Sequence, residues 1–223
     1  VASTWRALLD GASGGGPITK FDAARFPVRF ACEVKGFDPL QYMDRKEAKR
    51  SDAYTQYAVA ASLQAMADAG LTAGGFDPEM TGVIVGSGVG GLKSFEEQHD
   101  VYRELGPSKI SPFFIPGSII NMIGGHLSIK YGLKGPNIAV VSACTTANHS
   151  IGEAGRLIEY GDADVMIAGG THTMTAYDGA NVLTAATTTH YISPAPAAAA
   201  SRSSTPRTST SGTEAPDVTP TVV

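Results

Sequence analysis

Charged side chains, and basic ones in particular, are scarce in this chain. Of its 223 residues 17% are charged, and 17 Lys and Arg stand against 21 Asp and Glu, a net charge of −4. Because neutralising phosphates requires an excess of cations, nucleic acid is not expected as the main partner. No apolar run is long enough for a membrane-spanning helix, so no membrane partner is expected. The first residues, 1–6 (VASTWR), lack the basic-then-apolar pattern of a secretory signal.

Cysteine is equally rare. The chain has two, Cys32 and Cys144, far apart in unrelated contexts. They could form a disulfide, but the interpretation we favour is two reduced thiols in a cytosolic protein. No two His, Cys, Asp or Glu residues show metal-ligand spacing, so no metal site is expected. The 43% hydrophobic content is still enough for a sizeable core, in one α/β domain or a domain with a tail.

The most informative stretch is 137–147 (NIAVVSACTTA). Residues 138–141 are apolar and largely β-branched, which predicts a strand covered on both faces. From Thr145 the apolar spacing becomes helical, with Gly161 as the expected C′ residue. Cys144 is therefore predicted at a strand-to-helix turn, where free helix N–H groups stabilise a thiolate and an oxyanion. The alternative is an inert buried thiol.

Alternating short apolar runs and longer periodic segments predict an α/β protein with a mainly parallel, covered sheet. The predicted strands are residues 28–34, 81–85, 138–141 and 164–168. The predicted helices are residues 4–9, 45–69, 94–105, 118–130 and 145–160, with a compact aromatic turn at 112–116. Gly124 and Gly125 loosen the fourth helix unless another backbone packs closely there.

The loop 86–91 (GSGVGG) formally satisfies the dinucleotide-binding pattern GxGxxG. Such a site also needs a helix at once and, about twenty residues on, a second strand with a ribose-binding acid. Gly106 and Pro107 stand there instead, so no nucleotide is expected.

Several segments together resemble the β-ketoacyl-[acyl-carrier-protein] synthases, most of all the type II elongating enzymes. In the family's order, the cysteine region 141–147 is followed by 151–154 (IGEA) and 160–170 (YGDADVMIAGG). Further matching segments are 46–50 (KEAKR), 56–58 (QYA), 86–92 (GSGVGGL) and 110–116 (ISPFFIP). Several motifs in register are more specific than any one of them.

The resemblance implies a thiolase-like layered α/β fold with a covered mixed sheet, and an acyltransferase of fatty-acid elongation. Cys144 would accept an acyl chain as a thioester, its backbone N–H forming part of the oxyanion hole. Malonyl-carrier protein would then condense with that chain and lose carbon dioxide. The acyl groups arrive on the phosphopantetheine of acyl-carrier protein, so no other cofactor is implied. A polyketide-pathway synthase is a second interpretation, and a cysteine hydrolase, for which no base can be named, is a third.

The resemblance also assigns residues away from the cysteine. Val89 would line the acyl pocket, and Phe114 would contribute to the partner subunit's pocket across a homodimer. Lys46, Lys49 and Arg50 would dock acidic acyl-carrier protein. From the sequence alone, the alternative interpretation is that these three cations form a solvated helix face. A bacterial protein of this kind would be cytoplasmic, and a eukaryotic one plastid or mitochondrial.

The resemblance covers about residues 1–170, the N-terminal thiolase-like domain, without the family's opening strand in front. Residues 171–192 diverge, and 193–223 form a low-complexity tail whose composition predicts disorder. The family's enolate-stabilising histidines belong to a C-terminal half, and neither His172 nor His190 sits in a matching motif. We therefore expect the N-terminal half of a synthase. The alternative is a catalytically silent fragment or scaffold that still dimerises.

The other three histidines fall on predicted helices. His149 follows Cys144 by five residues, a spacing that turns its side chain away from the thiol. We therefore predict a packed or hydrogen-bonded histidine rather than a base. His126, beside the glycine pair, is predicted to pack, and His99, among acidic neighbours, to be solvated.

Overall fold

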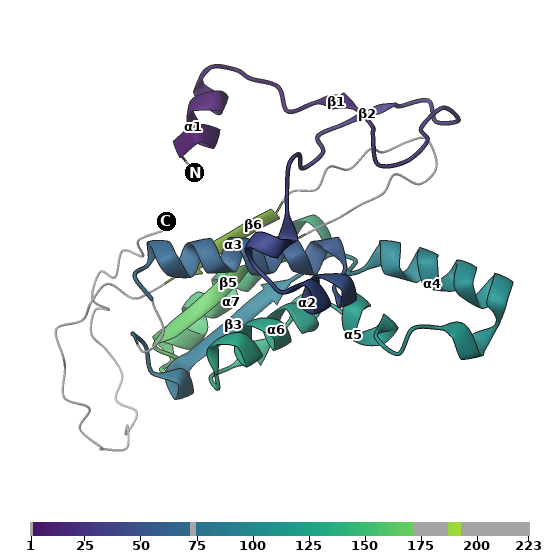
Figure 1. Cartoon of the computed structure of the whole chain (residues 1–223). Helices are drawn as coiled ribbons and strands as arrows, with labels where there is room; N and C mark the ends of the chain where they lie inside the picture. Colours follow the sequence, from purple (N-terminus) through teal and green to yellow (C-terminus); the bar gives the residue numbers. More distant parts are fainter. Residues whose placement is uncertain (1, 72–74, 172–186, 193–223) are drawn as a thin grey trace, which may run out of the picture.

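A four-stranded sheet lies at the centre of the computed structural model, which describes residues 2–71, 75–171 and 187–192 (Figure 1). Its order is β4-β3-β5-β6. The strands are β3 (Thr81–Gly86), β4 (Asn137–Ile138), β5 (Val165–Thr171) and β6 (Thr187–Ile192). β3 pairs in parallel with β4 and β5, and β6 runs antiparallel to β5. The expected mixed, mainly parallel sheet is confirmed.

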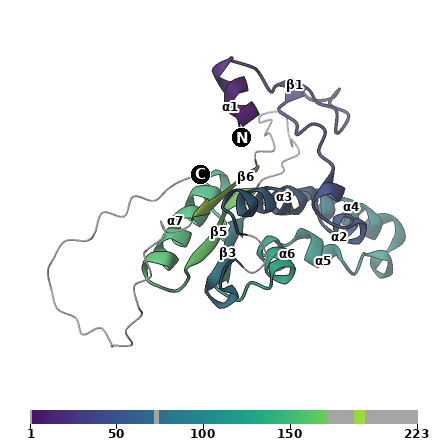
Figure 2. The same ribbon diagram turned by 60° about the vertical axis from the view of Figure 1, so that its left-hand side comes forward.

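Helices cover both faces of this sheet (Figures 1 and 2). α3 (Ala53–Asp68) and α6 (Met122–Tyr131) pack on one face, and α7 (Thr146–Glu159) packs on the other. Because side chains alternate along a strand, Val83 joins the core beneath α3 and α6 while Ile84 joins the core beneath α7. The result is the layered α/β arrangement that the sequence predicted.

The helix predicted over 45–69 is in fact two helices, α2 (Arg45–Arg50) and α3. Each begins after an aspartate, because Asp44 and Asp52 take extended backbone conformations at the two N-cap positions. Asp44 Oδ1 accepts the Glu47 N–H at 2.8 Å, which caps α2. The apolar periodicity of this segment starts only at Tyr54, so it carries no information about a break before α3.

The remaining helices are α1 (Ala2–Leu9), α4 (Leu92–Leu105) and α5 (Phe114–Ser118). α1 and α4 agree with the prediction. The prediction of an aromatic turn at 112–116 is wrong, since most of that segment belongs to α5. The helix predicted from residue 118 starts only at Met122, because Ile119 is extended and its carbonyl accepts the Tyr54 hydroxyl at 2.7 Å.

The strand predicted over 138–141 as covered on both faces is wrong. β4 has two residues and lies at the sheet edge, where Ile138 is 44% exposed and Val141 is 55% exposed. Within the described part of the chain, β3 is the only strand that pairs with β4. An apolar run therefore marked an open edge here rather than a buried strand. Gly124 lets α6 approach this strand, because a Cβ there would collide with the Asn137 side chain.

The N-terminal segment forms a small hairpin of β1 (Gly16–Pro17) and β2 (Phe30–Ala31), away from the central sheet (Figure 1). The strand predicted over 28–34 is reduced to β2. The Glu33 carboxylate holds the hairpin: it accepts the Thr19 hydroxyl at 2.6 Å, the Thr19 N–H at 3.0 Å and the Lys20 N–H at 3.2 Å. These bonds, the Thr19 hydroxyl first, lower the pKa of Glu33.

The predicted disorder of residues 193–223 lies outside the described residues, as does most of the divergent segment 171–192. β6 belongs to that segment and was not predicted. Among the helices that the structure describes, none combines the length and hydropathy needed to cross a membrane.

Candidate active site

Cys144 lies in a 3-10 turn, η4 (Ala143–Thr145), which leads directly into α7. The predicted position at the start of a helix is confirmed, although the strand before it ends six residues earlier, at Ile138. The cysteine is exposed, so the alternative of a buried thiol does not hold. Ala143 has a φ of 51°, the one positive value at a non-glycine among the described residues. A Cβ makes that conformation costly, by about 1–2 kcal/mol. The cysteine therefore follows a strained residue that its surroundings must hold in place.

Side chains from the first turn of α7 contact the residues just before the cysteine. The buried Thr146 hydroxyl accepts the Ser142 N–H at 3.0 Å and donates to the Ala143 carbonyl at 2.7 Å. The Nδ1 atom of His149 lies 2.6 Å from Ser142 Oγ. His149 is thus the hydrogen-bonded histidine that was predicted, and its partner belongs to the segment that carries Cys144.

Two glycines at the ends of parallel strands bring α7 close to the sheet. A Cβ at Gly86, the last residue of β3, would collide with the Val140 carbonyl and lie 2.6 Å from Thr146 Cγ2. A Cβ at Gly170, in β5, would lie 2.9 Å from the Ala147 nitrogen. The cysteine turn therefore sits at the carboxyl ends of parallel strands, where open α/β sheets form their ligand sites.

The glycine loop leaves the same edge of the sheet, because it follows β3. Val89, in this loop, is 45% exposed. The buried Ser87 hydroxyl accepts the Gly90 N–H at 3.1 Å, and the Ser118 carbonyl accepts the Gly91 N–H at 3.0 Å. The loop is therefore fixed by polar contacts while Val89 stays open to a ligand.

Where a dinucleotide fold needs a second strand, the chain forms a 3-10 turn, η3 (Pro107–Lys109). The prediction that this glycine loop is no nucleotide site agrees with that geometry.

Phe114 lies on α5 and is half-buried. Its ring packs edge-to-face on Phe95 of α4, with 4.9 Å between the ring centroids. The neighbouring Phe113 and Ile115 are exposed. An apolar surface therefore continues outward from Phe114.

The three cations predicted to dock a carrier protein all lie on α2 and are exposed: Lys46, Lys49 and Arg50. Within the described residues no salt bridge joins them to a carboxylate. The one acid of the helix, Glu47, instead faces α6, where its Oε1 atom lies 3.5 Å from Nδ1 of His126. The outward face of α2 is left basic.

His126 was predicted only to pack. It also bridges α6 to α2 through its contact with Glu47. Burial lowers its pKa, and the nearby Glu47 carboxylate opposes that shift. His99 is exposed and 3.8 Å from the Asp100 carboxylate, so its predicted solvation is confirmed. In the ranges that the structure describes, no group of three His, Cys, Asp or Glu residues could hold a metal ion.

A cavity of about 250 Å³ lies next to the basic face, between α2, α4, α5 and the start of α3. Arg50 forms part of its wall, with its guanidinium 3.9 Å from the centroid of the Phe113 ring. This stacking fixes one of the three cations without neutralising it.

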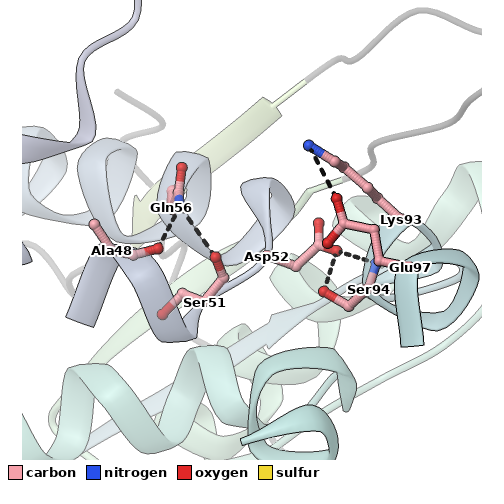
Figure 3. A network of polar contacts seen from close by, with 7 residues as sticks. All are labelled: Ala48, Ser51, Asp52, Gln56, Lys93, Ser94 and Glu97. Atoms are coloured by element: carbon pink, nitrogen blue, oxygen red, sulfur yellow. Dashed lines mark hydrogen bonds and ion pairs between the residues drawn. The ribbon is translucent and has the colours of Figure 1, made fainter. Parts of the chain in front are cut away.

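A polar network holds α2 in place beside this cavity (Figure 3). Gln56 Nε2 donates to the Ala48 carbonyl at 2.9 Å and the Ser51 carbonyl at 3.0 Å, which ties α2 to α3. Asp52 Oδ2 accepts the Ser94 N–H at 2.9 Å and its hydroxyl at 2.7 Å. Asp52 thus caps α4, whose own N-cap residue is a glycine without a side chain.

Comparison with known proteins decides the family. The sequence model described as "Beta-ketoacyl synthase, N-terminal domain" matches residues 1–205. The chain belongs to the β-ketoacyl synthase family. The 3-oxoacyl-[acyl-carrier-protein] synthase 2 of Vibrio cholerae is 52% identical over 170 residues, which cover 76% of this chain and 41% of that protein. Its Coxiella burnetii counterpart is 51% identical over 171 residues, 77% and 41% of the two chains. The chain therefore spans about two fifths of the length of these curated relatives.

Solved structures agree with the fold. "The ishigamide ketosynthase/chain length factor" superposes with a TM-score of 0.70 at 26% identity, covering 78% of this chain and 44% of that chain. A β-ketoacyl synthase from Burkholderia phymatum gives 0.69 at 24% identity, covering 78% and 43%. A type II polyketide ketosynthase in complex with its acyl-carrier protein gives 0.60 at 22% identity, covering 65% and 42%. The expected thiolase-like ketosynthase fold is confirmed.

Proposed function

We propose that this β-ketoacyl synthase family chain serves the fatty-acid elongation reaction, with Cys144 as the nucleophile. The observation that carries the proposal is the exposed Cys144 at the turn into α7, at the carboxyl edge of the parallel strands. The thiolate attacks the acyl carbonyl of acyl-carrier protein, and the phosphopantetheine thiolate leaves. Malonyl-carrier protein then loses carbon dioxide, its enolate attacks the acyl carbonyl, and the Cys144 thiolate leaves.

The turn also supplies a candidate oxyanion donor. Among the described residues no acceptor is bonded to the backbone N–H of Cys144, whereas the next N–H, that of Thr145, donates to the Ser142 carbonyl at 3.1 Å. A free, fixed N–H beside the nucleophile is suited to stabilising the oxyanion of an acyl group under attack. Val89 would line the acyl chain's path, and Phe114 would do so for a partner subunit.

Intact-mass analysis after incubation with acyl-carrier protein bearing an acyl group tests the proposal. We expect the mass of one acyl group, mapped to the peptide that contains Cys144. The variant C144A should lose the adduct and the control C32A should keep it. An adduct on Cys32, or one that persists in C144A, would refute the role of Cys144.

Acyl-carrier protein is the partner that the basic face of α2 fits best. Its three exposed cations lack salt-bridge partners within the described residues, and such a face attracts an acidic surface. The double variant K46E/K49E should weaken binding of acyl-carrier protein by about tenfold or more at low salt, and less at high salt. The double charge reversal K35E/K109E, at two exposed lysines outside α2, changes the net charge equally and is the matched control. Equal losses from both variants would show a net-charge effect instead of a docking face.

The edge strand β4 supports the homodimer. Among the described strands only β3 pairs with it, its Ile138 is 44% exposed, and a free strand edge readily pairs with another chain. Bacterial relatives support a cytoplasmic bacterial protein.

A polyketide-pathway synthase is the second candidate, since two of the solved structures carry polyketide or chain-length-factor titles. The higher identity to the curated 3-oxoacyl synthases favours fatty-acid elongation. Loading rates measured with purified carrier proteins of each pathway separate the two.

A further inference from the structure

The segment that carries Cys144 is held by two side chains of α7. Thr146 and His149 lie three residues apart and so share one face of the helix. Thr146 bonds the Ser142 N–H and the Ala143 carbonyl, and His149 bonds the Ser142 side chain at 2.6 Å. Every one of these contacts ends on the two residues directly before the cysteine.

Those two residues need such support. Ala143 holds a φ of 51°, a region that an L side chain rarely adopts, and such a conformation persists only where the surroundings impose it. Thr146 is buried, so its bonds are partly shielded from water, whereas His149 is exposed and Ser142 is half-buried. Among the described residues Ser142 is the only hydrogen-bond partner of the His149 imidazole. The imidazole therefore has one structural task in this part of the chain.

We propose that His149 is a positioning residue for the Cys144 thiol and acts through Ser142. This inference deepens the proposed function, because it concerns the same nucleophile. Whichever of the two groups carries the proton, the bond between Nδ1 and Oγ joins the start of the turn to α7. The strained Ala143 and the thiol after it are then held at the amino end of the helix. His149 itself need not touch the acyl group or take a proton from the thiol.

The test is the rate of alkylation of Cys144 by iodoacetamide, read by peptide mapping, with Cys32 in the same sample as the reference thiol. H149A should slow alkylation of Cys144 by about two- to tenfold, the rate equivalent of one hydrogen bond, and leave Cys32 unchanged. S142A should give a similar loss. The double variant H149A/S142A should be no slower than either single variant, because all three remove the same bond.

H149N supplies the control that a purely structural role would not satisfy. The Asn amide places a hydrogen-bonding atom close to the position of Nδ1, so it should restore most of the alkylation rate at Cys144. Wild-type rates in both H149A and S142A would overturn the inference, and so would losses that multiply in the double variant. If H149A fails to fold, S142A and H149N still decide the matter, because S142A leaves every α7 side chain in place.

The same variants, loaded from acyl-carrier protein, separate this inference from the proposed function. No acyl adduct on wild-type Cys144 would refute the function, while the alkylation rates would still decide the role of His149. Parallel losses in alkylation and acyl loading would support both.

Discussion

The two cysteines of this chain are both exposed, yet the backbone structure around them differs. Cys32 directly follows the two-residue strand β2, and a Cβ added at Gly14 would lie 3.9 Å from its Cβ and Sγ atoms, an ordinary van der Waals distance. Cys144 follows a strained alanine and stands at the start of a 14-residue helix. Exposure alone therefore does not distinguish the two thiols. Their places in the fold do, because of the two only Cys144 adjoins a helix N-terminus, whose N–H groups can stabilise negative charge that develops during a reaction.

The largest effect expected from this comparison is in thiol reactivity. With limiting iodoacetamide, the folded chain should be labelled at Cys144 about tenfold faster than at Cys32, because only Cys144 adjoins a helix N-terminus. Peptide mapping over a time course measures both rates. In denaturant the two rates should converge, since the helix is then lost. Dominant labelling of Cys32 in the folded chain would reverse the comparison.

A second prediction concerns how tightly the two sites are packed. G170A should reduce the free energy of unfolding by about 1–3 kcal/mol, because its Cβ would lie 2.9 Å from the backbone nitrogen of Ala147, which has little room to move. G14A, beside Cys32, should change it by less than about 0.5 kcal/mol. Denaturant unfolding measures both.

G152A is the control for the glycine substitution itself. Gly152 lies inside α7 with open space around it, so alanine should stabilise the chain by about 0.5–1 kcal/mol. A G170A variant as stable as G14A would show that the cysteine turn is not tightly packed against the sheet.

The smallest effect expected is a pH dependence confined to the hairpin that precedes Cys32. The Thr19 hydroxyl bond first, and then the Thr19 and Lys20 N–H bonds, lower the folded-state pKa of Glu33. A carboxyl whose folded pKa is depressed adds stability above its unfolded pKa and loses it as pH falls through the lower folded pKa. The amide NMR shifts of Thr19 and Lys20 should therefore titrate in that acid range.

E33Q should abolish this titration. The hydrogen bonds described around the Cys144 turn involve hydroxyl, imidazole and backbone groups and no carboxylate. The backbone amides of the Cys144 turn should therefore not follow the titration of Glu33. Amides of both sites moving together would indicate global unfolding instead of hairpin opening.

Much of the architecture was predictable because it depends on local chemistry. β3 and α4 follow from their own apolar patterns, and α7 ends as predicted, with Gly161 at a φ of 81°. β6 was missed although its sequence, TTTHYI, is rich in β-branched residues, because the surrounding segment has few large apolar residues. For the candidate site, the position of Cys144 and the bonded state of His149 were predicted, but the partner of His149 was not.

The sequence by itself determined where Cys144 stands, since a β-branched run, this cysteine and a helical period are neighbours in the chain. Tertiary structure alone decided what lies around it. Asp52 bonds Ser94, 42 residues away, and Glu47 turns inward to His126, so the break before α3 and the basic face of α2 depend on partners that no local pattern names. The exposure of β4 was decided in the same way, because an apolar run is equally suited to a buried strand and to an open edge.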